Sequence, residues 1–565
     1  MKAQKMALFF LLAAIFLIHG LLLAQATSKG DTLIIGPINH DGTPVGALNY
    51  YINSDTTATG ERVHSVYKLL HGKTYIITEP IIANYPLTIV ADYDESVIRP
   101  LIRAGLKTDG SPVSPLIETY DNMTLINLYI SGIAPTGDAS IGSKIIMNKG
   151  ENARHIIKSC VFENEFAKWG FLRNRAPGGK YYISDSKVRN FVRKGAVWTG
   201  TFLTLNIADT VKMVNNTFFN LNGPVITTSE DIGILYVEFD HNTFVNFVVH
   251  QWIMNVPVIA KVTNNIFYNC FTFSTGPKER SEQVDKTVNG IIHQHPMDPT
   301  VLDSVWSAKY DPNGDGTLVE SERVYTLKNN AWFYSQPIRD YWAANDSIAA
   351  QTWMNDTVRV KWFDDDEGHP FFVEENTLND DPGFLNAGGS DVLLAQNNQS
   401  ILEGTGGVQW SYNTDNDPVQ FEWPLPEDLS YTNATFLTAG EGGFPLGDLN
   451  WFKDKKDEWI TGVKSDLSTG VPTDFKLSQN YPNPFNPTTN ITYRIEKNIQ
   501  VSLTIYNLLG QKIRALVNEK QMAGEYRVQW DGRDENGHKV GSGIFFYTLN
   551  AGDKYQVTRK MIMMK

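Results

Sequence analysis

The sequence predicts an all-β protein in which a parallel β-helix forms most of the chain and a small β-sandwich follows it. The first observation is a repeated unit of a short apolar strand and an Asn-rich turn, as in "VKMVNNTFFN" and "AKVTNNIFYN". The second is its spacing, because periods in the twenties that combine strands and turns indicate a β-solenoid. The third is a polar break at 468–474, after which alternating strands and turn signals are typical of a sandwich.

The N-terminal residues 1–26 have the order expected of a secretory signal peptide. Lys2 and Lys5 precede an apolar run from Met6 to Ile18, and "AQA" follows at 24–26. The run is shorter than the roughly 20 residues that a membrane-spanning helix needs. We therefore expect cleavage after Ala26, and the alternative is an uncleaved anchor helix.

The repeat places similar residues of successive coils in columns. One turn column has gaps of 26, 30, 26, 23 and 65 residues and comprises Cys160, Ser186, Asn216, Asn242, Asn265 and Asn330. The segment "MTLINLYISG" adds Asn127 to this column. Asn suits such a turn because its amide bonds to the coils above and below. The expected interior column comprises Phe162, Val188, Phe218, Phe244, Phe267 and Trp332.

These columns also separate the only two cysteines, Cys160 and Cys270. They lie four coils apart, or roughly 19 Å at the spacing of strands in a sheet. A disulfide needs Cα atoms within about 7 Å of each other. We therefore expect two free, buried thiols. The alternative fold is a β-sandwich whose Asn-rich turns are a coincidence.

The "NNTFxN" coils resemble the right-handed parallel β-helix proteins of the pectate-lyase-like superfamily over about residues 90–390. This resemblance concerns the fold, which hosts lyases, hydrolases and noncatalytic proteins, so it does not supply an activity by itself. We expect the β-helix to occupy 27–450. An insertion between coils is expected at about 271–325, and a linker at 451–474.

The C-terminal segment 475–565 carries four ordered motifs. These are "YNLLGQ", "WDG", "SGIFFY" and an entry motif formed by Tyr481, Pro482, Asn483, Pro484 and Phe485. Together they resemble the type A sorting domain of the type IX secretion system, an Ig-like β-sandwich of about seven strands. The resemblance implies export through the outer membrane by the type IX translocon. The cargo would then be anchored at the cell surface or released.

The stretch "DPNGDGTLVESE" at 311–322 fits an EF-hand calcium loop. Its oxygen ligands suit Ca²⁺ and would come from Asp311, Asn313, Asp315, Thr317 and Glu322. A calcium sensor pairs two such loops between helices, whereas this loop stands alone before a predicted strand. We expect a structural Ca²⁺ site within the insertion, and the alternative is a turn without metal.

Basic residues gather in "RNRAPGGKYYISDSKVRNFVRKG", within one coil and its flanks. Because side chains alternate along a strand, an interior Val188 points Lys187 and Arg189 outward. On an acidic protein, this coil is where a polyanionic sugar would dock, with Arg175 as a binding residue. The neighbouring outward column offers contacts for sugar rings and comprises Thr217, Phe219, Thr243, Val245 and Tyr268.

Cleavage of a uronate by a lyase needs a cation that neutralises the carboxylate, together with a base and an acid. Pectate-lyase-like enzymes often use Arg or Lys on the outer face of the coils. The resemblance therefore implies Lys187, Arg189 and Arg193 as catalytic candidates. The alternative is a solvated charged face.

Aromatic residues are concentrated between 332 and 372. They comprise Trp332, Tyr334, Tyr341, Trp342, Trp353 and Trp362. Such rings stack on sugars, but the end of a β-helix must also be covered, and we favour this capping role.

Two classes of function fit the sequence. The first is an exported or surface protein, expected to be a monomer, that binds an acidic polysaccharide, either as a lyase that cleaves it or without cleavage. The second is a noncatalytic adhesive or structural protein with a calcium-stabilised β-helix. The formal net charge of −13 argues against nucleic acid as a partner.

Overall fold

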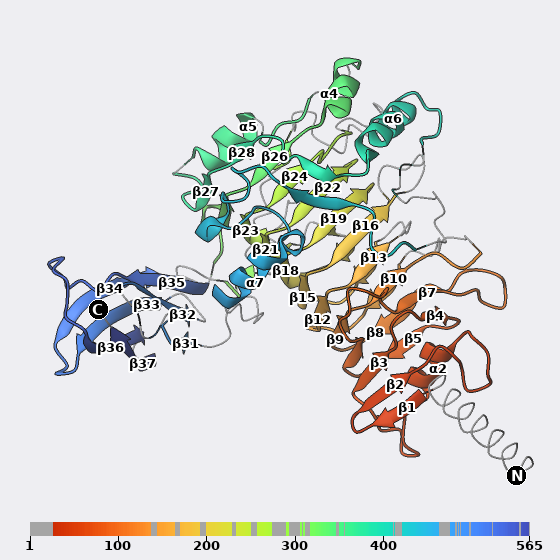
Figure 1. The fold of residues 1–565 in the computed structure, drawn as a ribbon, viewed down its shortest axis with the longest axis horizontal. Coiled ribbons are helices and arrows are strands. Elements are labelled where there is room, and N and C mark those ends of the chain that lie inside the picture. The colour runs from red at the N-terminus through yellow and green to blue at the C-terminus, as the bar shows by residue number, and fades with distance from the viewer. Residues whose placement is uncertain are drawn as a thin grey trace, which may run out of the picture. The chain divides into compact units, whose positions relative to one another are not determined.

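Three parallel sheets build the main body of the computed structural model (Figure 1). The structure describes residues 26–136, 144–163, 170–192, 199–228, 233–249, 257–273, 290–292, 306–307, 309–310, 317–345, 350–354, 356–365, 367–408, 410, 412, 421–462, 475–480, 483, 485, 487–495, 499–521, 524–552 and 555–563. These residues fall into two compact units, one of 1–298 with 320–464 and one of 299–319 with 465–565.

Sheet 1 has twelve strands among the described residues. In chain order they are β1 (Ala26–Lys29), β2 (Thr32–Ile35), β3 (Val66–Leu69), β6 (Leu87–Val90), β9 (Met123–Ile126), β12 (Arg154–Lys158), β15 (Gly179–Ser184), β18 (Ala208–Val214), β21 (Ile234–Asp240), β23 (Pro257–Thr263), β25 (Val324–Lys328) and β27 (Phe372–Glu375). All neighbours in this sheet are parallel except β1 and β2.

In the described part of the chain, sheet 2 has ten strands and sheet 3 has six. Sheet 2 contains β4 (Thr74–Ile77), β7 (Leu101–Ala104), β10 (Tyr129–Ser131), β13 (Val161–Glu163), β16 (Lys187–Phe191), β19 (Thr217–Leu221), β22 (Thr243–Phe247), β24 (Ile266–Tyr268), β26 (Ala331–Phe333) and β28 (Leu378–Asn379). Sheet 3 contains β5 (Ile81–Ala83), β8 (Ile117–Thr119), β11 (Ile146–Asn148), β14 (Leu172–Asn174), β17 (Leu203–Leu205) and β20 (Ile226–Thr228). Successive strands from β3 to β20 therefore visit sheets 1, 2 and 3 in turn, which confirms the predicted parallel β-helix.

The predicted interior column is confirmed strand by strand. The register pairs Phe162 with Val188, and continues through Phe218, Phe244, Phe267 and Trp332. The rings of Phe218 and Phe244 stack at 5.1 Å, and those of Phe244 and Phe267 at 4.9 Å. This spacing matches the distance between neighbouring strands, so the aromatic stack repeats with the coils.

The turn column forms a ladder of hydrogen bonds. Oδ1 of Asn242 accepts from the backbone N–H of Asn216 and from its side-chain amide, both at 3.0 Å. The same pattern joins Asn242 to Asn265 and Asn265 to Asn330. Asn265 and Asn330 are therefore in adjacent coils, although 65 residues separate them in the sequence. Asn127 was expected in this column, but Leu128 occupies the position. Tyr129 pairs with Val161, so the residue before Tyr129 is level with Cys160, the residue before Val161.

Asn127 instead joins a second column, one residue earlier, whose backbone is left-handed. Its members have φ between 52° and 60° and comprise Asn127, Ser159, Asp185, Asn215, His241, Asn264, Asn329 and Asn376. Asn and Asp adopt this conformation more readily than other non-glycine residues, which explains the paired Asn at these turns.

Both cysteines are free and buried, as predicted. Burial raises the pKa of the Cys160 thiol to about 11. The thiols are therefore protonated at neutral pH and unreactive.

Helices cover both ends of the β-helix, and other chain segments lie along its side. α2 (Ala47–Asn53) packs on β2, β4 and β5 at the N-terminal end. The remaining elements are η2 (Glu320–Glu322), α4 (Gln336–Ala343), α5 (Asp356–Val358), the π-helix η3 (Arg359–Phe363), β29 (Phe384–Asn386), α6 (Ser390–Leu402), β30 (Asp428–Tyr431), η4 (Glu441–Gly443), η5 (Leu449–Trp451) and α7 (Lys453–Gly462). Among the described residues, the last strand of these three sheets is β28, and the later elements up to residue 450 lie outside the sheets. Part of the expected linker is helical.

The second unit contains a β-sandwich with its own core around Trp530 and Tyr547. One sheet comprises β31 (Lys476–Leu477), β32 (Thr489–Ile495) and β35 (Gly524–Trp530). The other comprises β33 (Ile499–Asn507), β34 (Lys512–Gln521), β36 (Gly543–Ala551) and β37 (Tyr555–Met563). Every pairing between these strands is antiparallel. Seven strands match the predicted small sandwich.

Most of the predicted signal peptide lies outside the described residues, and Ala26 begins β1. Among the helices that the structure describes, none is long and apolar enough to cross a membrane.

Candidate functional site

Four predicted site residues lie on the outer face of sheet 2. Lys187 and Arg189 are on β16, Phe219 is on β19 and Tyr268 is on β24. They point away from the interior because Val188 and its column point inward, as the alternation predicts. This outer face is not open to solvent at these positions, however, because a later part of the chain covers it.

The covering segment, residues 421–452, is called the strap here. Phe421 lies beside Tyr129 on β10, with ring centroids 5.3 Å apart, and packs in the cluster that contains Leu101 of β7. Tyr431 packs at the other end, against Ile266 of β24 and Ala331 of β26. Between these ends, Glu427 bonds to Arg189 of β16, and Leu429 packs with Phe219 of β19 and Val245 of β22. The strap therefore runs across the strands of sheet 2, from coil to coil.

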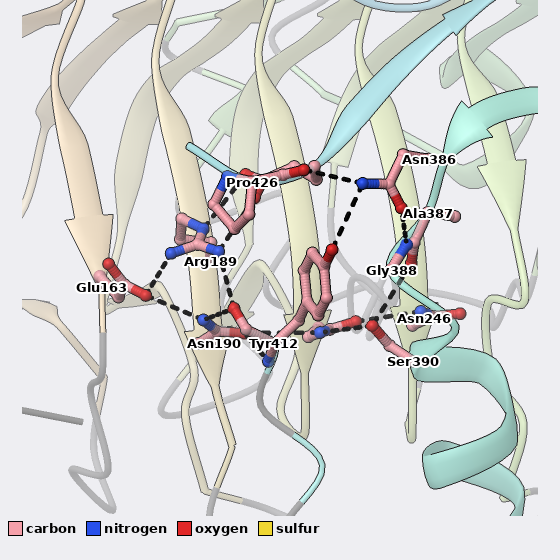
Figure 2. A network of polar contacts seen from close by, with 12 residues as sticks. Glu163, Arg189, Asn190, Asn246, Asn386, Ala387, Gly388, Ser390, Tyr412 and Pro426 are labelled. Atoms are coloured by element: carbon pink, nitrogen blue, oxygen red, sulfur yellow. Dashed lines mark hydrogen bonds and ion pairs between the residues drawn. The ribbon is translucent and has the colours of Figure 1, made fainter. Parts of the chain in front are cut away.

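Arg189 fastens the strap to the sheet (Figure 2). Its guanidinium donates to Glu427 of the strap through Nε at 3.1 Å and Nη2 at 2.9 Å, which is a bidentate pair. It also donates to Glu163 on the neighbouring strand and to the backbone oxygen of Tyr412. Arg189 is 1% exposed, Glu163 2% and Glu427 3%. The predicted exposure of Arg189 to a ligand is therefore wrong.

Hydrogen bonds complete this buried network. Asn190 donates to Glu163 at 2.8 Å and to the backbone oxygen of Tyr412 at 2.9 Å, and Tyr129 donates to Glu163. Burial raises the pKa of Glu163, and the charge of Arg189 opposes this effect. Burial also disfavours the charge of Arg189, but the two carboxylates outweigh it and raise its pKa. Arg189 is thus a fixed cation that holds two strands and the strap together.

Lys187 is covered by the strap in a different way. Its ammonium lies 3.6 Å from the ring centroid of Trp451, a cation–π contact. Burial lowers the pKa of Lys187, whereas Glu427 and Asp448 oppose this shift. Burial raises the pKa of Asp448 to about 6, although Thr217 donates a hydrogen bond of 2.7 Å to its carboxylate. Lys187 is therefore engaged with the strap, as Arg189 is.

The aromatic members of the outward column are also covered. Phe219 is 0% exposed and its ring lies 6.2 Å from that of Tyr412. Tyr268 is half-buried, with Phe384 at 5.4 Å between ring centroids. These residues bind the chain's own segments, so the predicted sugar platform on sheet 2 is occupied. Arg193, the third catalytic candidate, lies outside the described residues.

A second group of basic residues, one exposed and two half-buried, lies on sheet 3. Arg175 is exposed directly after β14, Arg173 is on β14, and Lys144 precedes the neighbouring strand β11. The pKa of Lys144 is lowered by partial burial and by the positive charges of Arg175 and Arg173, and Glu118 opposes this shift. Partial burial and Arg175 likewise lower the pKa of Arg173. We call Lys144, Arg173 and Arg175 the basic face. Arg175 is predicted from the sequence, whereas Lys144 lies about 30 residues earlier in the chain, and the pairing of β11 with β14 brings it close.

A pocket of 580 Å³ lies where sheet 2 ends. Its described lining comprises Trp332, Phe333, Tyr334, Arg339, Trp342, Ala343, Ala350, Gln351 and Asn379. Tyr341, Trp353 and Trp362 are buried in the core, which agrees with a capping role for these three residues. Trp332 is only half-buried and faces the pocket. The aromatic stretch therefore both caps the β-helix and lines a pocket. The polar residues of the pocket, Arg339, Gln351 and Asn379, were not predicted from the sequence.

The predicted calcium loop is described only in part. Asp311, Asn313 and Asp315 lie outside the described residues, whereas Thr317 is exposed and Glu322 is 6% exposed at the end of η2. Across the part of the chain that the structure describes, no group of three or more His, Cys, Asp or Glu residues is arranged to hold a metal.

Two residues of the predicted entry motif are described, and both are held by the sandwich. Asn483 accepts a hydrogen bond of 2.8 Å from the backbone N–H of Ile562, and Phe485 donates its own N–H to the oxygen of Ile562. The ring of Phe485 lies 5.6 Å from that of Trp530 in the core. Tyr481, Pro482 and Pro484 lie outside the described residues.

The fold and these sites define a parallel β-helix protein that carries a C-terminal Ig-like β-sandwich. Residues 482–554 match the family of FlgD Ig-like domains. Comparison of the chain with curated proteins gives no match.

Matching solved structures include two proteins of Porphyromonas gingivalis. Dimeric latent PorU is 18% identical over 17% of this chain and 10% of its own, with a TM-score of 0.14. PorZ, described as an essential bacterial surface component of the type IX secretion system, is 18% identical over 18% of this chain and 13% of its own, with a TM-score of 0.13. The chain thus spans little more than a tenth of either structure, and these similarities carry no functional argument.

Proposed function

We propose that this protein is exported to the cell surface or beyond and binds an acidic polysaccharide there without cleaving it. The observation that carries this proposal is the basic face on sheet 3. Partial burial and neighbouring positive charge lower the pKa values of Lys144 and Arg173, and together with the exposed Arg175 these residues form a positive patch on a chain whose formal net charge is −13. A polyanion relieves the repulsion between these charges when it binds. A binding role fits better than a lyase because Arg189 and Lys187 are engaged by the strap.

The basic face predicts a specific loss of polymer binding. The triple variant Lys144→Gln, Arg173→Gln, Arg175→Gln is expected to bind polygalacturonate or alginate at least tenfold more weakly than the natural protein. The reason is that charge supplies most of the attraction to a polyanion, so added salt also weakens binding. Affinity electrophoresis in gels that contain each polymer measures this effect, with dextran as the neutral reference.

A second triple variant controls for net charge. Lys68→Gln, Lys158→Gln and Lys328→Gln remove three cations from strands of sheet 1, whereas the basic face lies on sheet 3, and they should leave binding unchanged. Equal losses in both variants, or no retardation of the natural protein by any acidic polymer, would refute the proposal. The appearance of ultraviolet-absorbing unsaturated sugars would show that the protein is a lyase.

The proposal includes one structural Ca²⁺ in the loop 311–322. A single loop in an exported protein suits the weak binding, about 10⁻⁴–10⁻³ M, of extracellular calcium modules. Chelation of calcium is expected to speed proteolysis within the loop, because the ligands lose the ion that holds them together. Mass spectrometry of the fragments measures this change. Glu322→Gln should give the same cleavage without chelator, and cleavage that chelation leaves unchanged would reduce the motif to a turn.

Export through the type IX system is part of the same proposal. It is supported by the sequence motifs of residues 475–565 and by the Ig-like match at 482–554. The sandwich would serve as the address that the translocon reads, and the β-helix would be the cargo.

A further inference from the structure

The aromatic stack inside the β-helix ends at Trp332 without an aromatic successor. In sheet 2, Phe218, Phe244 and Phe267 each have the aromatic residue of the next coil above them, and all three are fully buried. The residue that follows Trp332 in the register is Asn379 of β28. Trp332 is consequently half-buried, and it lines the pocket together with this asparagine.

The aromatic residues that line the pocket are held in place by contacts with the rest of the β-helix and with one another. Nε1 of Trp342 donates to the backbone oxygen of Thr272 at 3.0 Å, and the hydroxyl of Tyr334 donates to the backbone oxygen of Cys270. The rings of Tyr334 and Trp342 meet edge to face at 4.6 Å, and those of Trp332 and Tyr334 at 6.0 Å. These contacts hold the rings in place before any ligand arrives, which reduces the entropy that binding costs.

The polar side chains of the pocket point to an anionic, hydroxyl-rich ligand. The guanidinium of Arg339 lies 5.1 Å from the ring centroid of Phe333 and donates to the side-chain oxygen of Gln336 at 3.0 Å. Within the described residues it forms no ion pair, and it is exposed at the rim. Asn379 and Gln351 add amide groups that can donate to and accept from hydroxyls. The volume of 580 Å³ lies within the range of about 300–1,000 Å³ that is usual for small-ligand pockets.

We propose that this pocket binds the terminal uronic acid of a polysaccharide chain. The apolar face of the pyranose lies on Trp332, because ring C–H groups carry partial positive charge and an aromatic face is negative. The carboxylate accepts from Arg339 in the bidentate geometry that guanidinium favours. This inference rests on the proposed function for its ligand class, but it concerns a different surface from the basic face.

Titration of the full-length Lys144→Gln, Arg173→Gln, Arg175→Gln variant with trigalacturonate tests the pocket without binding at the basic face. The intrinsic tryptophan fluorescence is expected to change on binding, with a smaller change in Trp332→Ala, and isothermal calorimetry gives the Kd. Trp332→Ala should weaken binding at least tenfold, or about 1.4 kcal/mol, whereas Trp332→Phe keeps a stacking face and most of the affinity. Arg339→Gln should weaken binding of trigalacturonate at least tenfold and leave that of neutral galactotriose unchanged.

Matched control variants and the polymer-binding assay distinguish a failure of the pocket proposal from a failure of the basic-face proposal. Trp423→Ala and Arg359→Gln remove the same residue types away from the pocket and should bind normally. The pocket proposal fails if trigalacturonate does not bind at millimolar concentrations. It also fails if Trp423→Ala loses trigalacturonate affinity as Trp332→Ala does. Equal binding of galactotriose would overturn the role of Arg339. If trigalacturonate binds normally while the basic-face variant keeps its polymer affinity, the pocket stands and the proposed role of the basic face fails.

Discussion

Replacing Arg189 with methionine is expected to lower the free energy of unfolding of the β-helix unit by about 3–5 kcal/mol. The change leaves the carboxylates of Glu163 and Glu427 buried side by side without a cation, in a region where both are at most 3% exposed. The strap also loses its bidentate attachment. Urea denaturation measures the loss, and limited proteolysis within 421–452 should become faster because the strap is released.

Three further variants isolate the cause. Arg189→Lys keeps the charge but cannot form the forked pair, so it should recover only part of the stability. The triple variant Arg189→Met, Glu163→Gln, Glu427→Gln removes the buried charges together and should be more stable than Arg189→Met alone. Arg175→Gln, an exposed arginine in the neighbouring coil, should change stability by less than about 0.5 kcal/mol. A loss below about 1 kcal/mol in Arg189→Met would mean that the network does not hold the strap.

Deleting residues 475–565 is expected to abolish export and leave the β-helix folded. The sandwich has its own hydrophobic core, so the deletion removes no residue of the β-helix core. In a bacterium with a type IX system, the shortened chain should accumulate in the periplasm and the natural chain outside the cell. Immunoblots of the fractions measure this, and circular dichroism compares the melting temperature of the β-helix in both chains.

A point variant tests whether loss of the folded sandwich, and not the shortening of the chain, prevents export. Phe485→Ala removes a buried ring that packs on Trp530, so it should unfold the sandwich and reduce export without removing the segment. Ile544→Ala, at an exposed position of β36, should be exported normally. Normal export of the shortened chain would disprove the role of the sandwich as an address.

The repeat was predictable because its physical cause is local. Each coil must bury one face, so Phe162, Phe218, Phe244 and Phe267 recur at the same place in the sequence unit and give the register directly. The error at Asn127 arose because two turn columns lie side by side, and Asn suits both for different reasons. One column forms the amide ladder and the other requires a left-handed backbone.

The cover over sheet 2 was not predictable in the same way. Arg189 and Glu427 are 238 residues apart, and the strap has no periodicity that would match it to the strands it crosses. Alternation along β16 predicts that Arg189 leaves the interior, but it does not predict what lies outside. The pocket has a comparable origin, since Trp332, Arg339 and Asn379 come from a strand, a helix and the last strand of the sheet. The aromatic cluster was visible in the sequence, but its shared cavity was not.

The strap changes how the β-helix can come apart. In an ordinary solenoid each repeat touches only its neighbours, so the ends fray and unfolding proceeds repeat by repeat. Here a single segment contacts strands from β7 to β26, so loosening of one coil strains attachments many coils away. The covered coils should consequently melt in one cooperative transition, with amide hydrogens along sheet 2 exchanging at similar, slow rates. A β-helix tied together in this way should resist pulling along its length better than one whose coils contact only their neighbours.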